Sequence, residues 1–237
     1  MTRVAVIGLG GVADRIHLPA LRALSSVELV GACEPDEQRR VRLGRRFAIP
    51  ALYADAETLL RATKPDVVVI GTPPDSHHAL ALRAIESGAH VFCEKPFVRT
   101  PAEADDIIAA ADRAGRLVAV NNQYRFMPIY RQTRERLVRG EFGPPFLVQG
   151  WQQMFHPPSY ETNWRAGLVE STLFEFGTHA LDLICFFFDA LPLSIAAHTP
   201  HPRPDIEADV VVVCTLRFEG ERVATLVLNR ISHAPER

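Results

Sequence analysis

The chain has 237 residues, of which 47% are hydrophobic and 23% charged, and its formal net charge is −2. This composition is typical of a globular protein, and the length favours one large or two modest domains. Positive and negative residues are mixed without a long run of either sign, so neither nucleic acid nor a membrane surface is an expected partner. The longest apolar stretch, residues 181–188, contains Asp182 and is too short to span a bilayer.

The cysteines and the N-terminus predict a cytoplasmic protein. The chain leads directly into a predicted strand, without the pattern of a signal peptide. Its four cysteines are far apart and form no CxxC pair, so they are predicted to be reduced and mostly buried. Cys93, two residues before Lys95, could be reactive, but its apolar neighbours favour a small buried strand residue.

A short apolar strand, residues 3–7, is followed at once by the sequence GLGGVA. Gly8 permits a tight turn, Gly10 lets the backbone approach a pyrophosphate, and Ala13 lets helix and strand pack closely. A helix is predicted from there through Leu24, and its N-terminus would hold the phosphates. The residues predicted to bind a dinucleotide here are Gly8, Gly10, Gly11, Val12 and Ala13.

A second predicted strand, residues 27–33, ends in Glu34, at about the distance from the glycines expected of an acid that binds the adenosine ribose. A carboxylate there accepts hydrogen bonds from the ribose hydroxyls and repels a 2′-phosphate. The sequence therefore favours NAD over NADP, although Arg39 and Arg40 follow closely and weaken that preference. The alternative for Glu34 is an exposed acid in a loop.

Strand and helix patterns alternate through the rest of the first half. Residues 67–70 are a continuous β-branched run, as expected of a strand buried on both faces, and a Gly-Thr-Pro-Pro turn follows. Asp36, Ser76 and Thr100 are typical of helix starts. The predicted helices span residues 36–47, 53–61, 76–85 and 101–114, and two more strands span 91–93 and 117–120. This alternation predicts a doubly wound parallel sheet over residues 1–122.

The strand at residues 91–93 delivers Glu94, Lys95 and Pro96, a charged pair followed by proline. Ligands of open α/β sheets bind outside the carboxyl ends of the strands, so Lys95 is predicted at the mouth of a crevice. Pro96 stiffens the backbone beside it. The alternative is a solvated Glu–Lys pair at the surface.

After about Tyr124 the alternation ends. The predicted elements that follow are helices over residues 130–139 and 175–188 and strands over residues 146–154, 210–218 and 223–231. The last two strands are separated by a Glu-Gly-Glu turn and predict a hairpin. Residues 123–237 are therefore predicted to form an α+β domain with an open, mostly antiparallel sheet.

Several motifs occur in the order seen in a known family. They are GLGGVA, HLPA, GTPPDSHH, SGAHVFCEKPF, NNQYRF and the helix EFGTHALD, which is similar to a DxGxHxxD pattern. The chain thus resembles the Gfo/Idh/MocA oxidoreductases, the glucose-fructose oxidoreductase and inositol dehydrogenase family. The resemblance covers nearly the whole chain and implies an N-terminal Rossmann domain and a second domain with an open sheet. It also implies sugar, cyclitol or related polyol substrates and homo-oligomers formed through the second sheet.

Two features depart from the family pattern. Family members are usually longer, so a short form or an incomplete second sheet is expected. The usual aspartate of the helix motif is Glu175 here. Its carboxylate reaches one methylene further, which could alter substrate choice or weaken a catalytic contact.

Oxidation of an alcohol needs a hydride acceptor, which a nicotinamide supplies, and a base for the hydroxyl proton. Glu175, His179 and Asp182 fall on one face of the predicted helix. His179 is the leading acid–base candidate because imidazole titrates near neutral pH, and a carboxylate one turn away would orient it. The resemblance adds that Lys95 hydrogen-bonds the reacting oxygen and shares the proton transfer. The alternatives for His179 are an ordinary core or surface histidine, and a metal site for which no further cluster completes the ligands. For Asp182 the alternative is a hydrogen bond to a helix terminus or to an arginine.

The catalytic residues are thus expected to be Lys95, His179 and Glu175. Beyond the glycine turn and Glu34, the cofactor is expected to contact Thr72, Pro73, His77, Glu94, Lys95, Asn122 and Arg165. The substrate is expected to contact Lys95, Arg125, Trp164, Glu175 and His179. Positions at the surface are the alternative for the two arginines and for His77.

The sequence predicts an NAD-dependent dehydrogenase that acts on a hydroxyl of a sugar, cyclitol or related polyol, without a metal. Two other functions stay open. One is a non-catalytic regulator on the same fold that senses a dinucleotide or a sugar. The other is a redox-assisted glycoside hydrolase or lyase that reoxidises its cofactor within one turnover.

Overall fold

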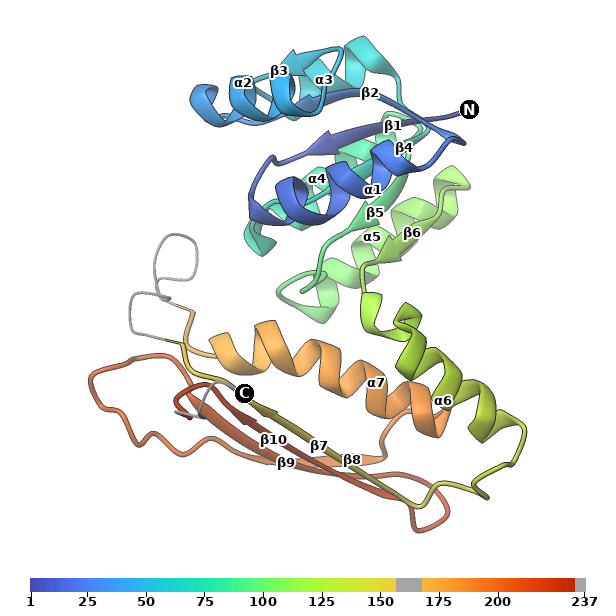
Figure 1. The fold of residues 1–237 in the computed structure, drawn as a ribbon, viewed down its shortest axis with the longest axis vertical. Coiled ribbons are helices and arrows are strands. Elements are labelled where there is room, and N and C mark those ends of the chain that lie inside the picture. Colours follow the sequence, from blue (N-terminus) through green and yellow to red (C-terminus); the bar gives the residue numbers. More distant parts are fainter. Residues whose placement is uncertain (157–167, 233–237) are drawn as a thin grey trace. The chain divides into compact units, whose positions relative to one another are not determined.

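The structure is a computed structural model that describes residues 1–156 and 168–232 (Figure 1). The chain divides into two compact units, Met1–Asn121 and Asn122–Arg237. Each unit contains a sheet and a hydrophobic core of its own. Within the described ranges, every helix is too short or too polar to cross a membrane.

The first unit is built on a six-stranded, wholly parallel sheet in the order β3-β2-β1-β4-β5-β6. Its strands are β1 Thr2–Ile7, β2 Val27–Cys33, β3 Leu52–Tyr53, β4 Val67–Ile70, β5 His90–Cys93 and β6 Val118–Val120. The strand order reverses between β1 and β4. The doubly wound parallel sheet predicted from the sequence is therefore confirmed, and its switch point lies at the carboxyl ends of β1 and β4.

Helices cover both faces of this sheet (Figure 1). They are η1 Ala13–His17, a π-helical turn, then α1 Leu18–Ala23, α2 Glu37–Arg46, α3 Ala56–Thr63, η2 Pro74–Ser76, α4 His77–Glu86 and α5 Pro101–Ala114. Alternate residues of a strand point to opposite faces, so Ala5 and Ile7 pack with α3, α4 and α5, whereas Val4 and Val6 pack with α1 and α2. Burial on both faces explains why β4 reads as an uninterrupted apolar run.

Local side chains set where these helices begin. Asp36 accepts a backbone N–H at the start of α2, and Thr100 forms a capping box with Glu103 at the start of α5, both at the predicted positions. Ser76 is the N-cap residue of α4, but its hydroxyl donates within the preceding turn instead of capping the helix. The predicted helix over residues 53–61 begins too early, because Tyr53 belongs to β3 and the helix starts at Ala56.

The second unit has a four-stranded sheet in the order β7-β10-β9-β8. Its elements are η3 Gln123–Phe126, α6 Pro128–Val138, β7 Leu147–Gln153, η6 Leu173–Gly177, α7 Thr178–Phe188, β8 Ser194–His198, β9 Val211–Arg217 and β10 Val223–Asn229. The predicted hairpin of β9 and β10 is confirmed, and β8 also pairs antiparallel with β9. β7 runs parallel to β10, so the sheet is mixed with mostly antiparallel pairs.

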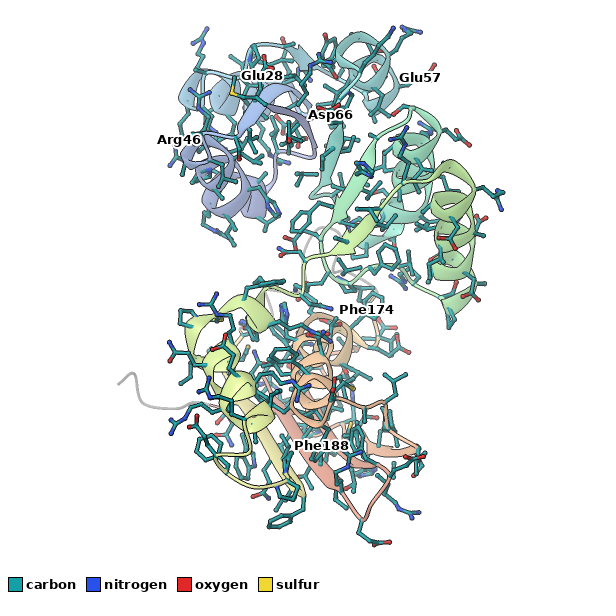
Figure 2. All side chains as sticks on the ribbon, turned by 90° about the vertical axis from the view of Figure 1, so that its right-hand side faces the viewer. Glu28, Arg46, Glu57, Asp66, Phe174 and Phe188 are labelled. Atoms are coloured by element: carbon teal, nitrogen blue, oxygen red, sulfur yellow. The ribbon has the colours of Figure 1, made fainter. Side chains whose placement is uncertain are left out.

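One face of the second sheet is covered by α7. Leu226 and Leu216 are fully buried there and pack with Ile184 and Phe188. Phe188, labelled in Figure 2, ends α7 with its ring centroid 4.6 Å from that of Phe218. This packing fixes the helix that carries the predicted histidine.

Candidate active site

The glycine turn after β1 leaves room for a ligand at one glycine and none at the other. Gly8 has a φ of +89°, and a Cβ built on it would lie 2.7 Å from Thr72 Cγ2 and 3.0 Å from the Gly71 carbonyl. A Cβ on Gly10 would meet only the Gly71 carbonyl oxygen, at 3.9 Å. The chain itself therefore requires Gly8, whereas the absence of a side chain at Gly10 leaves backbone open to a close-approaching group such as a pyrophosphate.

The rest of the turn continues into η1. A Cβ on Gly11 would lie 3.3 Å from the guanidinium of Arg15, and Ala13 is fully buried. Val12 stands just before the first π-helical residue. The small side chain of Ala13 thus packs against the sheet as the sequence predicted.

Glu34, at the end of β2, is buried against the glycine turn. Only 6% of its surface is exposed, and its Oε2 accepts the Leu9 N–H at 2.9 Å. Its Oε1 accepts the Asp36 N–H at 3.1 Å and lies 3.4 Å from Arg39 Nη1. The alternative of an exposed loop acid is therefore wrong. A carboxylate has about four acceptor positions, so Glu34 can accept these bonds and still receive a ribose hydroxyl.

Arg40 bonds to the backbone beside Glu34. Its Nη1 donates to the carbonyl oxygens of Glu34 and Pro35, at 2.5 and 3.1 Å. Of the two arginines that weakened the preference for NAD, this one is held by the backbone and Arg39 faces the Glu34 carboxylate.

His77 ties the turn after β4 to the loop after β5. It is fully buried, with Nε2 2.8 Å from the Thr72 carbonyl oxygen and Nδ1 2.9 Å from that of Pro96. A neutral imidazole donates to one of these oxygens at a time. The structure thus places His77 between two segments of backbone, and Pro73 lies in the turn that it holds. His78 instead pairs with Asp106 at the surface.

Glu94 follows β5 and is buried, with 6% of its surface exposed. Its Oε1 accepts from His17 Nε2 at 2.8 Å and from Asn121 Nδ2 at 2.6 Å. Its Oε2 accepts the Lys95 backbone N–H at 3.2 Å. Burial by itself raises the pKa of this carboxyl, but the hydrogen bonds from His17 and Asn121 outweigh burial and lower the pKa below the ordinary value. Glu94 is therefore an ionised internal acceptor at neutral pH.

Lys95 is half-buried in the loop beyond β5. The surface Glu–Lys pair considered for this segment is wrong, because Glu94 points into the protein. The sequence contains only one other lysine, Lys64, so the chain uses arginine for nearly all of its positive charge. Cys93 is fully buried, and burial raises the pKa of its thiol, which excludes it as a reactive nucleophile.

The second unit carries His179 at the start of α7. The residue is 5% exposed, and its ring stacks on Tyr124 with centroids 4.2 Å apart and planes 10° from parallel. Glu175 is 2% exposed and lies one turn earlier, in the π-helical turn η6. Short π-helical turns occur often at functional sites, and this chain has one at each of its two groups of predicted residues.

Asp182 pairs with an arginine, which was the alternative to its orienting the imidazole. Its carboxylate accepts from Arg125 Nε and Nη2, each at 2.7 Å, and from Asn122 Nδ2 at 3.1 Å. The hydrogen bond to Asp182 raises the pKa of Arg125. Arg125 and Asn122, predicted to contact substrate and cofactor, are thus joined to α7. The guanidinium of Arg125 also lies 5.1 Å from the ring centroid of Phe186.

Two predicted residues, Trp164 and Arg165, lie outside the described residues. Among those that are described, no group of three or more His, Cys, Asp or Glu side chains is arranged to hold a metal ion.

The fold and these residues agree with comparisons to known proteins. Residues 2–122 match the model of an oxidoreductase family with an NAD-binding Rossmann fold, and residues 130–237 match the Gfo/Idh/MocA C-terminal domain. The chain therefore belongs to the Gfo/Idh/MocA oxidoreductase family, as its motifs suggested.

Two curated relatives are named sugar dehydrogenases. D-glucoside 3-dehydrogenase of Escherichia coli is 34% identical over 146 residues, which cover 62% of this chain and 42% of that protein. D-apiose dehydrogenase of Paraburkholderia graminis is 31% identical over 220 residues, which cover 91% of this chain and 57% of that protein. The chain thus spans about half the length of these relatives.

Solved structures show the same fold. Myo-inositol 2-dehydrogenase from Lactobacillus plantarum aligns with a TM-score of 0.87 and 22% identity, over 98% of this chain and 70% of that one. An oxidoreductase from Agrobacterium radiobacter, solved with NAD⁺, L-tartaric acid and magnesium, aligns with a TM-score of 0.89 and 21% identity, over 100% of this chain and 68% of that one.

Sequence reasoning gave His17 no role, although it belongs to one of the quoted motifs. Its partner Glu94 lies 77 residues away, and pairing at that separation leaves no periodic trace.

The glycine turn predicts a difference between two alanine substitutions. Gly10→Ala is expected to weaken NAD binding about tenfold or more, about 1.4 kcal/mol, because the new methyl group takes the space left for the pyrophosphate. Its free energy of unfolding should stay close to that of the native protein. Gly8→Ala, the matched comparison, should also destabilise the fold by about 1–3 kcal/mol, because its φ is positive and its Cβ meets backbone. Calorimetric titration with NAD and urea unfolding measure both quantities. A Gly10→Ala protein that binds NAD normally would contradict this account of the turn.

Proposed function

We propose that the chain acts as an NAD-dependent dehydrogenase that oxidises a hydroxyl group of a sugar, cyclitol or related polyol. The observation that supports it most is the glycine turn: Gly10 is open at the switch point of a doubly wound sheet, and the buried Glu34, at the end of β2, accepts the Leu9 N–H of the same turn. The names of the two curated relatives support a sugar as substrate.

NAD is proposed over NADP because of the charge of Glu34. Its carboxylate is buried at the end of β2, where the ribose of a dinucleotide is expected. A 2′-phosphate would bring a second negative charge beside it. Arg39 offsets part of this repulsion, since its Nη1 lies 3.4 Å from the carboxylate.

In the proposed reaction, the bound nicotinamide supplies the hydride acceptor. Lys95 holds the substrate hydroxyl, and His179 removes its proton as the C–H bond gives up a hydride, so that the alcohol becomes a carbonyl compound. Tyr124 limits the movement of His179 because the two rings are stacked. Glu175, Trp164 and Arg125 are proposed to contact the substrate as well.

A panel of sugars and inositols tests this proposal, with NADH formation as the readout and NADP as the alternative cofactor. Lys95→Met and His179→Asn are each expected to lower kcat/KM about 10²- to 10⁴-fold, the usual contribution of a proton-transferring group. Lys64→Met and His78→Asn, which replace an exposed lysine and the surface histidine, are the matched controls and should keep native turnover.

A native protein that binds NAD yet reduces none with any member of the panel would overturn the dehydrogenase and favour a regulator. Conversion of a glycoside without net NADH would favour the redox-assisted hydrolase or lyase.

We also propose a cytoplasmic location and association of copies through the second sheet. All four cysteines are free thiols, which supports a reducing compartment.

On the sheet face opposite α7, Trp151 pairs with Val227 and Val227 with Val213, and Trp151 is 63% exposed. Trp151→Lys is expected to lower the oligomeric state in sedimentation velocity, whereas Val138→Lys, on the exposed side of α6, should not. A native protein that sediments as a monomer would refute association.

A further inference from the structure

We propose that His17 is a positioning residue for Lys95, acting through the buried carboxylate of Glu94. In this role His17 joins the helical turn after the glycines to the loop that carries the amine. The inference rests on the proposed function in one respect, that Lys95 is the reacting amine.

His17 is buried inside the first unit. It is the last residue of η1, 6% exposed, and its ring meets that of Phe92 edge-on with centroids 6.0 Å apart. The ring is therefore held between the segment after the glycine turn and β5. In this setting Nε2 faces Glu94 Oε1 at 2.8 Å.

The Glu94 carboxylate accepts hydrogen bonds from three donors. A buried carboxylate is costly unless several donors satisfy it. Those donors come from three parts of the sheet edge: His17 after β1, Asn121 after β6, and the Lys95 N–H after β5. Because Oε1 takes the two side chains and Oε2 takes the backbone, the donors on one oxygen set the direction in which the other oxygen faces Lys95.

The loop that carries Lys95 is also in contact with His77, at Pro96 and Phe97. His77 Nδ1 lies 2.9 Å from the carbonyl oxygen of Pro96 and 3.1 Å from that of Phe97. The four residues 94–97 are thus held from one side by His77 and from the other by Glu94. Both contacts limit how far the backbone at Lys95 can move.

This arrangement separates positioning from proton transfer. Loss of the His17 donor leaves Oε1 with Asn121, so the carboxylate can rotate and the Lys95 backbone can shift. A displacement on the order of 1 Å at a reacting group can cost about 100-fold in rate. Because most of the proposed substrate contacts other than Lys95 belong to the second unit, KM should be affected much less than kcat.

Two substitutions at the same site test the role of the donor. His17→Leu removes the Nε2 donor, whereas His17→Gln keeps an N–H donor near the same place. Thr63→Val is the control, because it removes a different buried hydrogen-bond donor of the first unit, the hydroxyl that donates to the Leu59 carbonyl. Turnover is measured at saturating NAD with the best substrate of the panel, so that kcat and KM are separated.

A second readout needs no turnover. Lys95 and Lys64 are the only lysine amines, so limited acetylation followed by mass spectrometry gives their labelling ratio, with exposed Lys64 as the internal standard. His17→Leu is expected to move this ratio outside the range set by the native and Thr63→Val proteins. It should also lower kcat about 10- to 100-fold with KM nearly unchanged, and His17→Gln should restore most of both.

A folded His17→Leu protein with native kcat and a native labelling ratio would overturn the inference, as would a His17→Gln protein as impaired as His17→Leu. If His17→Leu fails to fold, Glu94→Gln keeps the side-chain volume and is judged by the same two readouts. A native protein that turns over no polyol refutes the proposed function, while the labelling ratio still decides the role of His17.

Discussion

The burial of one negative charge, on Glu94, organises the part of the molecule that carries Lys95. A carboxylate with so little exposed surface needs donors, and it takes them from segments that follow β1, β5 and β6. The parallel sheet makes this possible, because all of these segments follow the carboxyl ends of its strands, which lie on the same side of the sheet. Satisfying the charge therefore also links these three connections to one another through a single side chain.

Glu34 is a second buried acid that holds nearby backbone in place. Its carboxylate, at the end of β2, accepts the Leu9 N–H and so fastens the glycine turn to the sheet. In the second unit, Asp182 connects α7 to the segment before α6 by accepting hydrogen bonds from Arg125 and Asn122. In each case an acid that looks like a ligand-binding residue in the sequence also holds its own surroundings. A residue so held keeps its geometry before a ligand arrives, which lowers the cost of binding.

Local chemistry made most of the first unit predictable. Three short-range signals are found where expected: the β-branched run of β4, the caps Asp36 and Thr100, and the proline at the start of α5. In the second unit β8 was missed because Ser194–His198 is an exposed edge strand whose one large apolar residue, Ile195, gives no alternating pattern in sequence. The contacts of the candidate site were the least predictable. His17 meets Glu94 across 77 residues, and Arg125 meets Asp182 across 57, so only the folded chain reveals them.

The central claim is that this chain moves a hydride from a carbon–hydrogen bond of a polyol to NAD. The most direct measurement uses a substrate from the active class that carries deuterium on the carbon that is oxidised. After a single turnover, mass spectrometry of the nucleotide locates the isotope. The account predicts that the reduced cofactor carries the deuterium. Deuterium released to water, with an unlabelled nucleotide, would contradict it.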